Sequence, residues 1–174
     1  MEKTLSTTEL RWNTGDYVVY KKRGVYEISE IRTEKVAGDT ADYYVLRSVY
    51  DLNATVYVPA DKPSLVSQIE SVLTAQQVEE IICTAKANPM EWISVNGERF
   101  ALGDETVAKG EVKDVLSLML LLMEKRQEAI STKTKFFAHD ERNLNTAKKI
   151  ISDAFAFPLG IDRKEVVDYI VANT

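Results

Sequence analysis

The spacing of apolar residues changes near residue 60, and this change limits what the chain can fold into. Before it, Tyr, Val, Ile and Thr gather in four short runs, at 16–20, 24–31, 43–50 and 55–58. These residue types favour pleated strands, and the Gly, Asp and Asn between the runs favour tight turns. The first third of the chain therefore predicts four or five short strands that form a small curled sheet or barrel.

After Pro59 the apolar residues recur at the spacing of an amphipathic helix. Thr74 and Gln77 match a capping box, and Asp162 is placed to cap a last helix through Ile170. The remaining helices are expected over 64–73, 74–87, 110–123 and 141–155, and Pro158 to Gly160 end the last of these. The second part of the chain therefore predicts a bundle of helices.

The two patterns together predict an α+β chain with two small domains. A length of 174 residues suits one domain of ordinary size or two small ones. We place the boundary between Pro59 and Pro63. Residues 1–62 then form a Tudor- or SH3-like β-barrel domain with a short N-terminal extension, and residues 63–174 form an all-α helical bundle domain.

Charge and cysteine content restrict the partners and the compartment. The chain has 22 Lys and Arg against 27 Asp and Glu, a net charge of −5, which disfavours free-standing DNA binding. A single cysteine cannot form an internal disulfide, and the polar N-terminus lacks the apolar stretch of a signal peptide. The most apolar run, 115–123, is shorter than the roughly 20 residues that span a bilayer. We expect a cytoplasmic protein without membrane contact.

The sequence carries no recognisable catalytic or cofactor-binding pattern. It has no P-loop, GxGxxG, HExxH, CxxC or GxSxG motif, and only one histidine. His139 is expected to be exposed or to cap a helix, and Cys83 is expected to be a small buried side chain. We therefore expect no metal, no cofactor and no enzymatic activity.

Binding is the function that remains open to such a chain. A small barrel has edge strands, and an edge strand can pair with the sheet of a partner. Arg47 and Tyr57 lie on expected strands late in the β region, where Tyr57 can either pack on the barrel or contact a partner. Trp92 follows a Pro-containing connection. It can pack in the core, which the usual burial of Trp favours, or act as an apolar wedge against a base step.

The order of motifs resembles a known family. The β region runs from Gly15-Asp16-Tyr17-Val18-Val19-Tyr20 through Gly24-Val25 and Tyr44-Val45-Leu46 to Val56-Tyr57-Val58-Pro59-Ala60. This order is similar to the RNA-polymerase-interacting domain of CarD-like bacterial transcription regulators, which also occurs in the transcription-repair coupling factor. The second half follows the CarD order, with Trp92, Arg99, Gly110-Glu111-Val112, and a segment from Ala147 to Leu159-Gly160.

The resemblance implies a function and a set of contact residues. In this family the β domain adds a strand to the β subunit of RNA polymerase, at its lobe and protrusion. The helical domain places a tryptophan against the minor groove of promoter DNA at the upstream edge of the bubble, which stabilises the open complex. The matching polymerase-binding positions are Arg32, Arg47 and Tyr57, and the DNA-binding positions are Trp92, Arg99 and Lys86. The alignment near Arg32 could equally point at Glu34.

The charge of the second half leaves an alternative function open. From Pro63 onward the chain has 13 basic and 17 acidic residues, a net charge of −4, which weakens phosphate contacts. DNA contact is therefore expected only where polymerase holds the protein near the promoter. The alternative is a protein-only adaptor whose β module binds a partner without any DNA contact.

Overall fold

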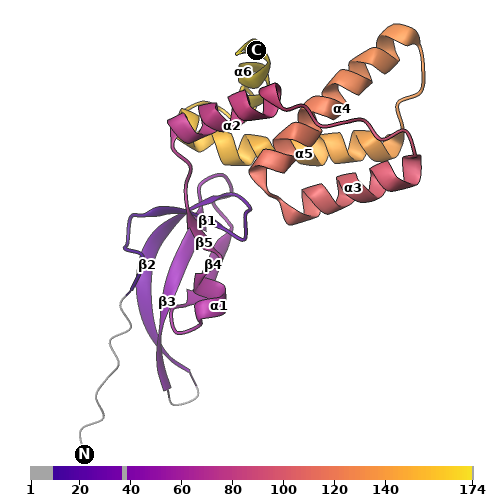
Figure 1. Cartoon of the computed structure of the whole chain (residues 1–174). Helices are drawn as coiled ribbons and strands as arrows, with labels where there is room; N and C mark the ends of the chain where they lie inside the picture. Colours follow the sequence, from indigo (N-terminus) through magenta and orange to yellow (C-terminus); the bar gives the residue numbers. More distant parts are fainter. Residues whose placement is uncertain (1–9, 37–38, 174) are drawn as a thin grey trace, which may run out of the picture. The chain divides into compact units, whose positions relative to one another are not determined.

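The computed structural model describes residues 10–36 and 39–173, and it divides the chain into two compact units. Unit 1 is Met1–Val72 and unit 2 is Leu73–Thr174. Unit 1 is built on a β-sheet and unit 2 on helices (Figure 1). The predicted α+β class, a Tudor-like domain followed by a helical region, is confirmed.

Unit 1 is a five-stranded antiparallel sheet with the strand order β4-β3-β2-β1-β5. Its elements are β1 (Tyr17–Tyr20), β2 (Val25–Val36), β3 (Asp39–Ser48), β4 (Thr55–Pro59), α1 (Pro63–Val66) and β5 (Ile69–Ser71). One face of the sheet carries the core, in which Ile28, Tyr44 and Leu46 are fully buried. The register of β2 shifts between Ile28 and Glu30, and this bulge keeps the apolar residues on either side of Ser29 on the core face.

The boundary between the units lies ten residues later than the sequence predicts, after Val72 instead of Lys62. The expected helix over 64–73 is only the four-residue α1, and the chain then forms β5. β5 pairs with β1, with Tyr20 opposite Ile69 and Val18 opposite Ser71. These residues form a strand although their apolar spacing also fits a helix, because in the strand Ile69 is 1% exposed and completes the core of the sheet.

Unit 2 contains five helices over the residues described. They are α2 (Ala75–Ala87), α3 (Asn96–Lys109), α4 (Val112–Thr132), α5 (Ala138–Leu159) and α6 (Val166–Ala172). α5 packs against each of the other four (Figure 1). The buried residues follow the predicted stripes and include Val78, Ile82, Val115, Leu116, Met119, Leu122, Leu144, Ala147, Ile151 and Ile170.

Several local signals of unit 2 behave as the sequence predicts, and others do not. Thr74 and Gln77 form both hydrogen bonds of the capping box. Gly160 ends α5 in the left-handed conformation, at a φ of 66°. Asp162 instead caps the turn before α6, by accepting from the backbone of Lys164. Cys83 is exposed, contrary to expectation, because a helix turns by about 100° per residue and Ile82 takes the core side.

Helix α3 is the element that apolar spacing does not delimit. Its first turn contains Gly97, its apolar residues are few, and the residues it buries include Arg99, Gly103 and Thr106. Gly103 lies against Asn143 of α5, so closely that a Cβ would meet the amide nitrogen at 2.5 Å. α3 therefore packs through small and polar residues, which hydrophobic periodicity does not reveal.

Among the described residues, no helix is long and apolar enough to cross a membrane.

The role of β5 as the closing strand leads to a stability prediction. Ile69→Ala should lower the free energy of unfolding of unit 1 by about 2–5 kcal/mol, because it leaves a cavity beneath the sheet. Urea unfolding of the full chain in a Trp92→Phe background, followed by the fluorescence of Trp12, reports on unit 1. Glu70→Ala on the exposed side of β5 is the matched control and should stay within about 0.5 kcal/mol. If both changes lower the free energy of unfolding equally, Ile69 of β5 does not contribute to the core as assigned.

Candidate functional site

The first candidate surface is the free edge of the sheet at β4. Ser48 donates to the carbonyl of Ala54, and Ala60 donates to that of Asp42, so the even-numbered residues of β4 bond to β3. Because successive residues of a strand alternate, the N–H and C=O groups of Thr55 and Tyr57 point away from β3. In the described part of the chain they have no backbone partner. The edge therefore offers two complete residues for strand pairing, and Pro59, which has no N–H, limits it.

The three predicted polymerase-binding residues lie on one face of this sheet. Tyr57 is opposite Val45, and Arg47 is opposite both Thr55 and Glu27. Arg32 follows on β2, two pairs beyond the row that joins Glu30 to Val45 and Tyr57. Directly paired residues share a face, so Arg32, Arg47 and Tyr57 all project from the side opposite the core.

Electrostatic contacts link this face to the β4 edge. The guanidinium of Arg32 lies 5.9 Å from the centroid of the Tyr57 ring, and the Tyr57 side chain is 52% exposed. Arg32 also pairs with Glu30, and with Glu34 at 3.5 Å. Glu30 raises the pKa of Arg32. Arg32 and Glu34, the two residues that the resemblance offers for one polymerase-binding position, thus form an exposed ion pair, and Arg32 lies beside Tyr57.

The second candidate surface surrounds Trp92, in the extended segment that precedes α3. The Trp92 side chain is half-buried, so it is neither a core residue nor a free wedge. The Arg99 guanidinium lies 4.3 Å from the centroid of its ring, and the Lys125 ammonium lies 5.8 Å from it. Trp92 is therefore held at the surface of unit 2 by cations from α3 and α4.

Arg99, one of the predicted DNA-binding residues, is buried and paired within unit 2. It is 6% exposed, and its Nε and one terminal nitrogen donate to the Asp140 carboxylate at 3.0–3.2 Å. Its other terminal nitrogen donates to the carbonyl of Ile93 at 2.9 Å, and Asn96 accepts a further bond at 2.8 Å. Arg99 therefore joins the segment that carries Trp92 to α3 and α5.

Lys86 also makes contacts within the protein. Its ammonium donates to the carbonyls of Ile170 and Asn173, both at 2.7 Å, at the end of α6. A cation at the carboxyl end of a helix satisfies carbonyls that lack helical partners. The structure thus separates Lys86 from the surroundings of Trp92 and gives it the role of fastening α6 to α2.

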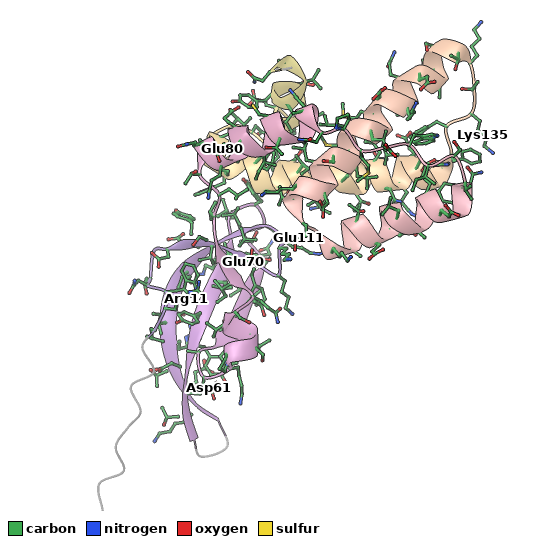
Figure 2. The ribbon with its side chains drawn as sticks, in the orientation of Figure 1. Arg11, Asp61, Glu70, Glu80, Glu111 and Lys135 are labelled. Atoms are coloured by element: carbon green, nitrogen blue, oxygen red, sulfur yellow. The ribbon has the colours of Figure 1, made fainter. Side chains whose placement is uncertain are left out.

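Sequence reasoning missed several residues close to Trp92. Lys125 belongs to α4, and Lys135 and Phe137 belong to the loop before α5, which Figure 2 shows with Lys135 labelled. A hydrogen bond to Glu128 raises the pKa of Lys125 above its ordinary value, so its charge is retained. The sequence signal for this group is the run Lys133-Thr134-Lys135-Phe136-Phe137, in which aromatic residues follow cations outside any helix.

The only histidine lies on the other side of the Arg99 cluster. The His139 ring stacks on Phe100 at 4.3 Å between centroids, and its Nε2 lies 2.8 Å from Asp104. Hydrogen bonds with His139 and Asn143 lower the pKa of Asp104. His139 is thus partly buried by an aromatic contact, contrary to the expectation of an exposed or capping residue. Among the described residues, no three His, Cys, Asp or Glu side chains are grouped so that they could hold a metal ion.

The comparison with known families assigns unit 1. Its strand order, its apolar face and its free β4 edge define a small Tudor-like interaction domain. A family model described as the CarD-like/TRCF RID domain matches residues 12–70, about a third of the chain. Residues 12–70 therefore carry a CarD-like/TRCF RNA polymerase-interacting domain, as the sequence predicts for the β region. The matched residues take in β1 to β4 completely and reach into β5, which agrees with the later domain boundary.

The buried Arg99–Asp140 pair leads to a second stability prediction. Asp140→Ala should lower the free energy of unfolding of unit 2 by about 3–5 kcal/mol, because it leaves the Arg99 charge buried without a partner. It should also change the fluorescence of Trp92 in a Trp12→Phe background. Glu141→Ala removes the neighbouring, more exposed pair with Arg126 and should cost about 1 kcal/mol or less. The role assigned to Asp140 fails if urea unfolding gives the same loss for both variants.

Proposed function

We propose that this protein is a non-enzymatic regulator of transcription that binds the β subunit of RNA polymerase and stabilises the promoter open complex. Unit 1 docks by adding the β4 edge to a strand of the β subunit lobe and protrusion, and Trp92 of unit 2 contacts the minor groove at the upstream edge of the bubble. The match of residues 12–70 to a polymerase-interacting domain is the observation that supports this role most directly.

The geometry of unit 1 supports β4 as the edge that meets polymerase. β4 has five residues, whereas the opposite edge, β5, has three. The face beside β4 carries Arg32, Arg47 and Tyr57, so a strand that pairs with Thr55 and Tyr57 would also meet these side chains. Backbone pairing supplies affinity and the side chains supply selectivity, as in other cases of strand addition.

The position of Trp92 supports the DNA contact. Its ring is half-buried at the surface of unit 2, where Arg99 and Lys125 restrict its movement. A fixed aromatic ring can act against a base step with little loss of side-chain entropy. Because Arg99 and Lys86 are engaged within the protein, phosphate contacts here depend on other basic groups.

The second candidate function is a protein-only adaptor, and the charge of unit 2 favours it. Residues 63–174 carry a net charge of −4, and two of the basic residues expected to face DNA are paired internally. In this case unit 1 binds polymerase and unit 2 recruits another protein. Promoter DNA binding that requires polymerase and weakens with salt would exclude the adaptor.

The edge proposal predicts an asymmetry between two proline substitutions. Tyr57→Pro removes an outward N–H without breaking a bond to β3, and it should weaken polymerase binding by about tenfold or more, since a hydrogen bond contributes about 0.5–1.5 kcal/mol and the ring also obstructs pairing. Ser71→Pro removes an outward N–H at the β5 edge and should leave binding unchanged. Tyr57→Ala separates the side chain from the backbone. Titration of a β-subunit lobe and protrusion fragment measures all three, and a stronger effect of Ser71→Pro would move the contact to β5.

The DNA proposal predicts that polymerase binding and promoter opening respond differently at Trp92. Trp92→Ala should leave the affinity for the polymerase fragment unchanged, because Trp92 belongs to unit 2. It should abolish the effect of the protein on open-complex lifetime at a promoter with an unstable bubble. Trp92→Phe keeps an aromatic ring and should retain part of the effect. A Trp92→Ala protein that remains folded and still stabilises the open complex would favour the adaptor.

A further inference from the structure

A hollow opens beside Trp92 at one end of unit 2. Its volume is about 370 Å³, and it is lined by segments from five parts of the unit: the stretch before α3, the start of α3, the end of α4, the loop that leads into α5, and the first turn of α5. The side chains that define it are those of Trp92, Arg99, Lys125, Lys135, Phe137 and Asp140. The volume lies near the lower limit of small-ligand sites, about 300–1,000 Å³.

The hollow has aromatic sides and a polar interior. The Arg99 guanidinium lies 4.3 Å from the centroid of the Trp92 ring and 5.7 Å from that of the Phe137 ring, so both rings face the same buried cation. The bonds from Arg99 to Asp140, Ile93 and Asn96 fix this cation in place. Trp92 and Phe137 are thus held before any ligand arrives, as flat surfaces suited to stacking.

The hollow also has a cation at its mouth. Within it, Arg99 is paired with Asp140, and Lys125 is paired with Glu128 at 2.8 Å. Lys135 is exposed, its ammonium lies 4.9 Å from the centroid of the Phe137 ring, and it makes no ion pair with any described residue. The charges of the Arg99–Asp140 and Lys125–Glu128 pairs cancel, so the positive charge of Lys135 remains beside the aromatic rings. This balance differs from that of unit 2 as a whole, which is acidic.

We propose that this hollow binds a single nucleotide, with the base stacked on Trp92 and Phe137 and its one phosphate at Lys135. One planar ring and one negative charge match the two aromatic surfaces and the single unpaired cation. The volume admits one base and no base pair, so the nucleotide comes from an unpaired strand or from free solution. The inference extends the proposed DNA contact of Trp92 from the minor groove of a duplex to an unstacked base.

The test uses the full chain without polymerase, so it stays separate from docking at β4. In a Trp12→Phe background, the fluorescence of Trp92 is followed on addition of thymidine monophosphate, a short oligothymidylate, or a duplex of the same length. We expect saturable quenching by the oligothymidylate, less by the duplex, and weaker quenching by the mononucleotide. Thymidine without phosphate should bind more weakly than thymidine monophosphate. Binding of the mononucleotide as tight as that of the oligothymidylate would identify a free nucleotide as the source.

Two lysines of the same loop provide the decisive comparison. Lys135→Gln should weaken binding of a labelled oligothymidylate several-fold and reduce the slope of log affinity against log salt by about 0.7, the value for one phosphate of a single strand. Lys133→Gln removes the same charge two residues away, outside the hollow, and should leave the slope unchanged. Trp92→Leu should weaken binding by about tenfold, as expected for the loss of one stacked base.

Three results would overturn the proposal. They are equal effects of Lys133→Gln and Lys135→Gln, binding of duplex at least as tight as that of the single strand, and a Trp92 signal that no nucleic acid changes. Equal effects of the two lysine substitutions would indicate general electrostatic attraction without a specific phosphate site. Preference for duplex would indicate that Trp92 contacts the minor groove and binds no unstacked base. Loss of polymerase binding in the Tyr57→Pro protein has no bearing on these measurements, so failure of either proposal can be recognised.

Discussion

The buried ion pair between Arg99 and Asp140 is the constraint on which the surface of unit 2 depends. Arg99 is 6% exposed, and burial of a charge is costly unless its hydrogen bonds are satisfied. Its bonds reach Asp140 on α5, Asn96 on α3 and the backbone at Ile93, next to Trp92. A tryptophan that precedes a helix would otherwise be free to move, so a pair that contributes little net stability has its main effect in fixing one conformation of this segment.

Pairing in unit 1 has a similar consequence at the level of the backbone. The bonds from Ser48 to Ala54 and from Ala60 to Asp42 determine which residues of β4 face inward, and so leave Thr55 and Tyr57 outward. The same register places Arg32 and Arg47 on the face of Tyr57. Because a shift of one residue would reverse every side chain, the buried Val58 and Leu46 indirectly determine the interaction surface.

The sequence predicts the parts of this protein that rest on regular periodicity. Strands β1 and β4 and the apolar stripes of α4 and α5 lie where residue type and apolar spacing indicate, and the capping box at Thr74 forms as predicted. β2 runs on to Val36 and β3 begins at Asp39, so these two strands extend beyond the predicted runs 24–31 and 43–50. β5 is not predictable in this way, since three residues carry no period and Ile69 fits a helical stripe equally well. The positions of Arg99 and Lys86 also escape prediction, because a basic residue near Trp92 in sequence can bond to Asp140 or to α6, far along the chain. Pairing partners at such separations depend on tertiary packing.

An acidic protein can still contact DNA if the contact is local and the protein is held in place. Residues 63–174 carry a net charge of −4, yet the hollow at Trp92 retains one positive charge at Lys135 after its ion pairs are counted. One phosphate contact gives little affinity by itself and little dependence on salt. Attachment of unit 1 to polymerase raises the local concentration of unit 2 near the promoter without any additional DNA contact. Under the proposed function, a weak affinity for free DNA would confine the action of Trp92 to promoters where polymerase has already unpaired the strands.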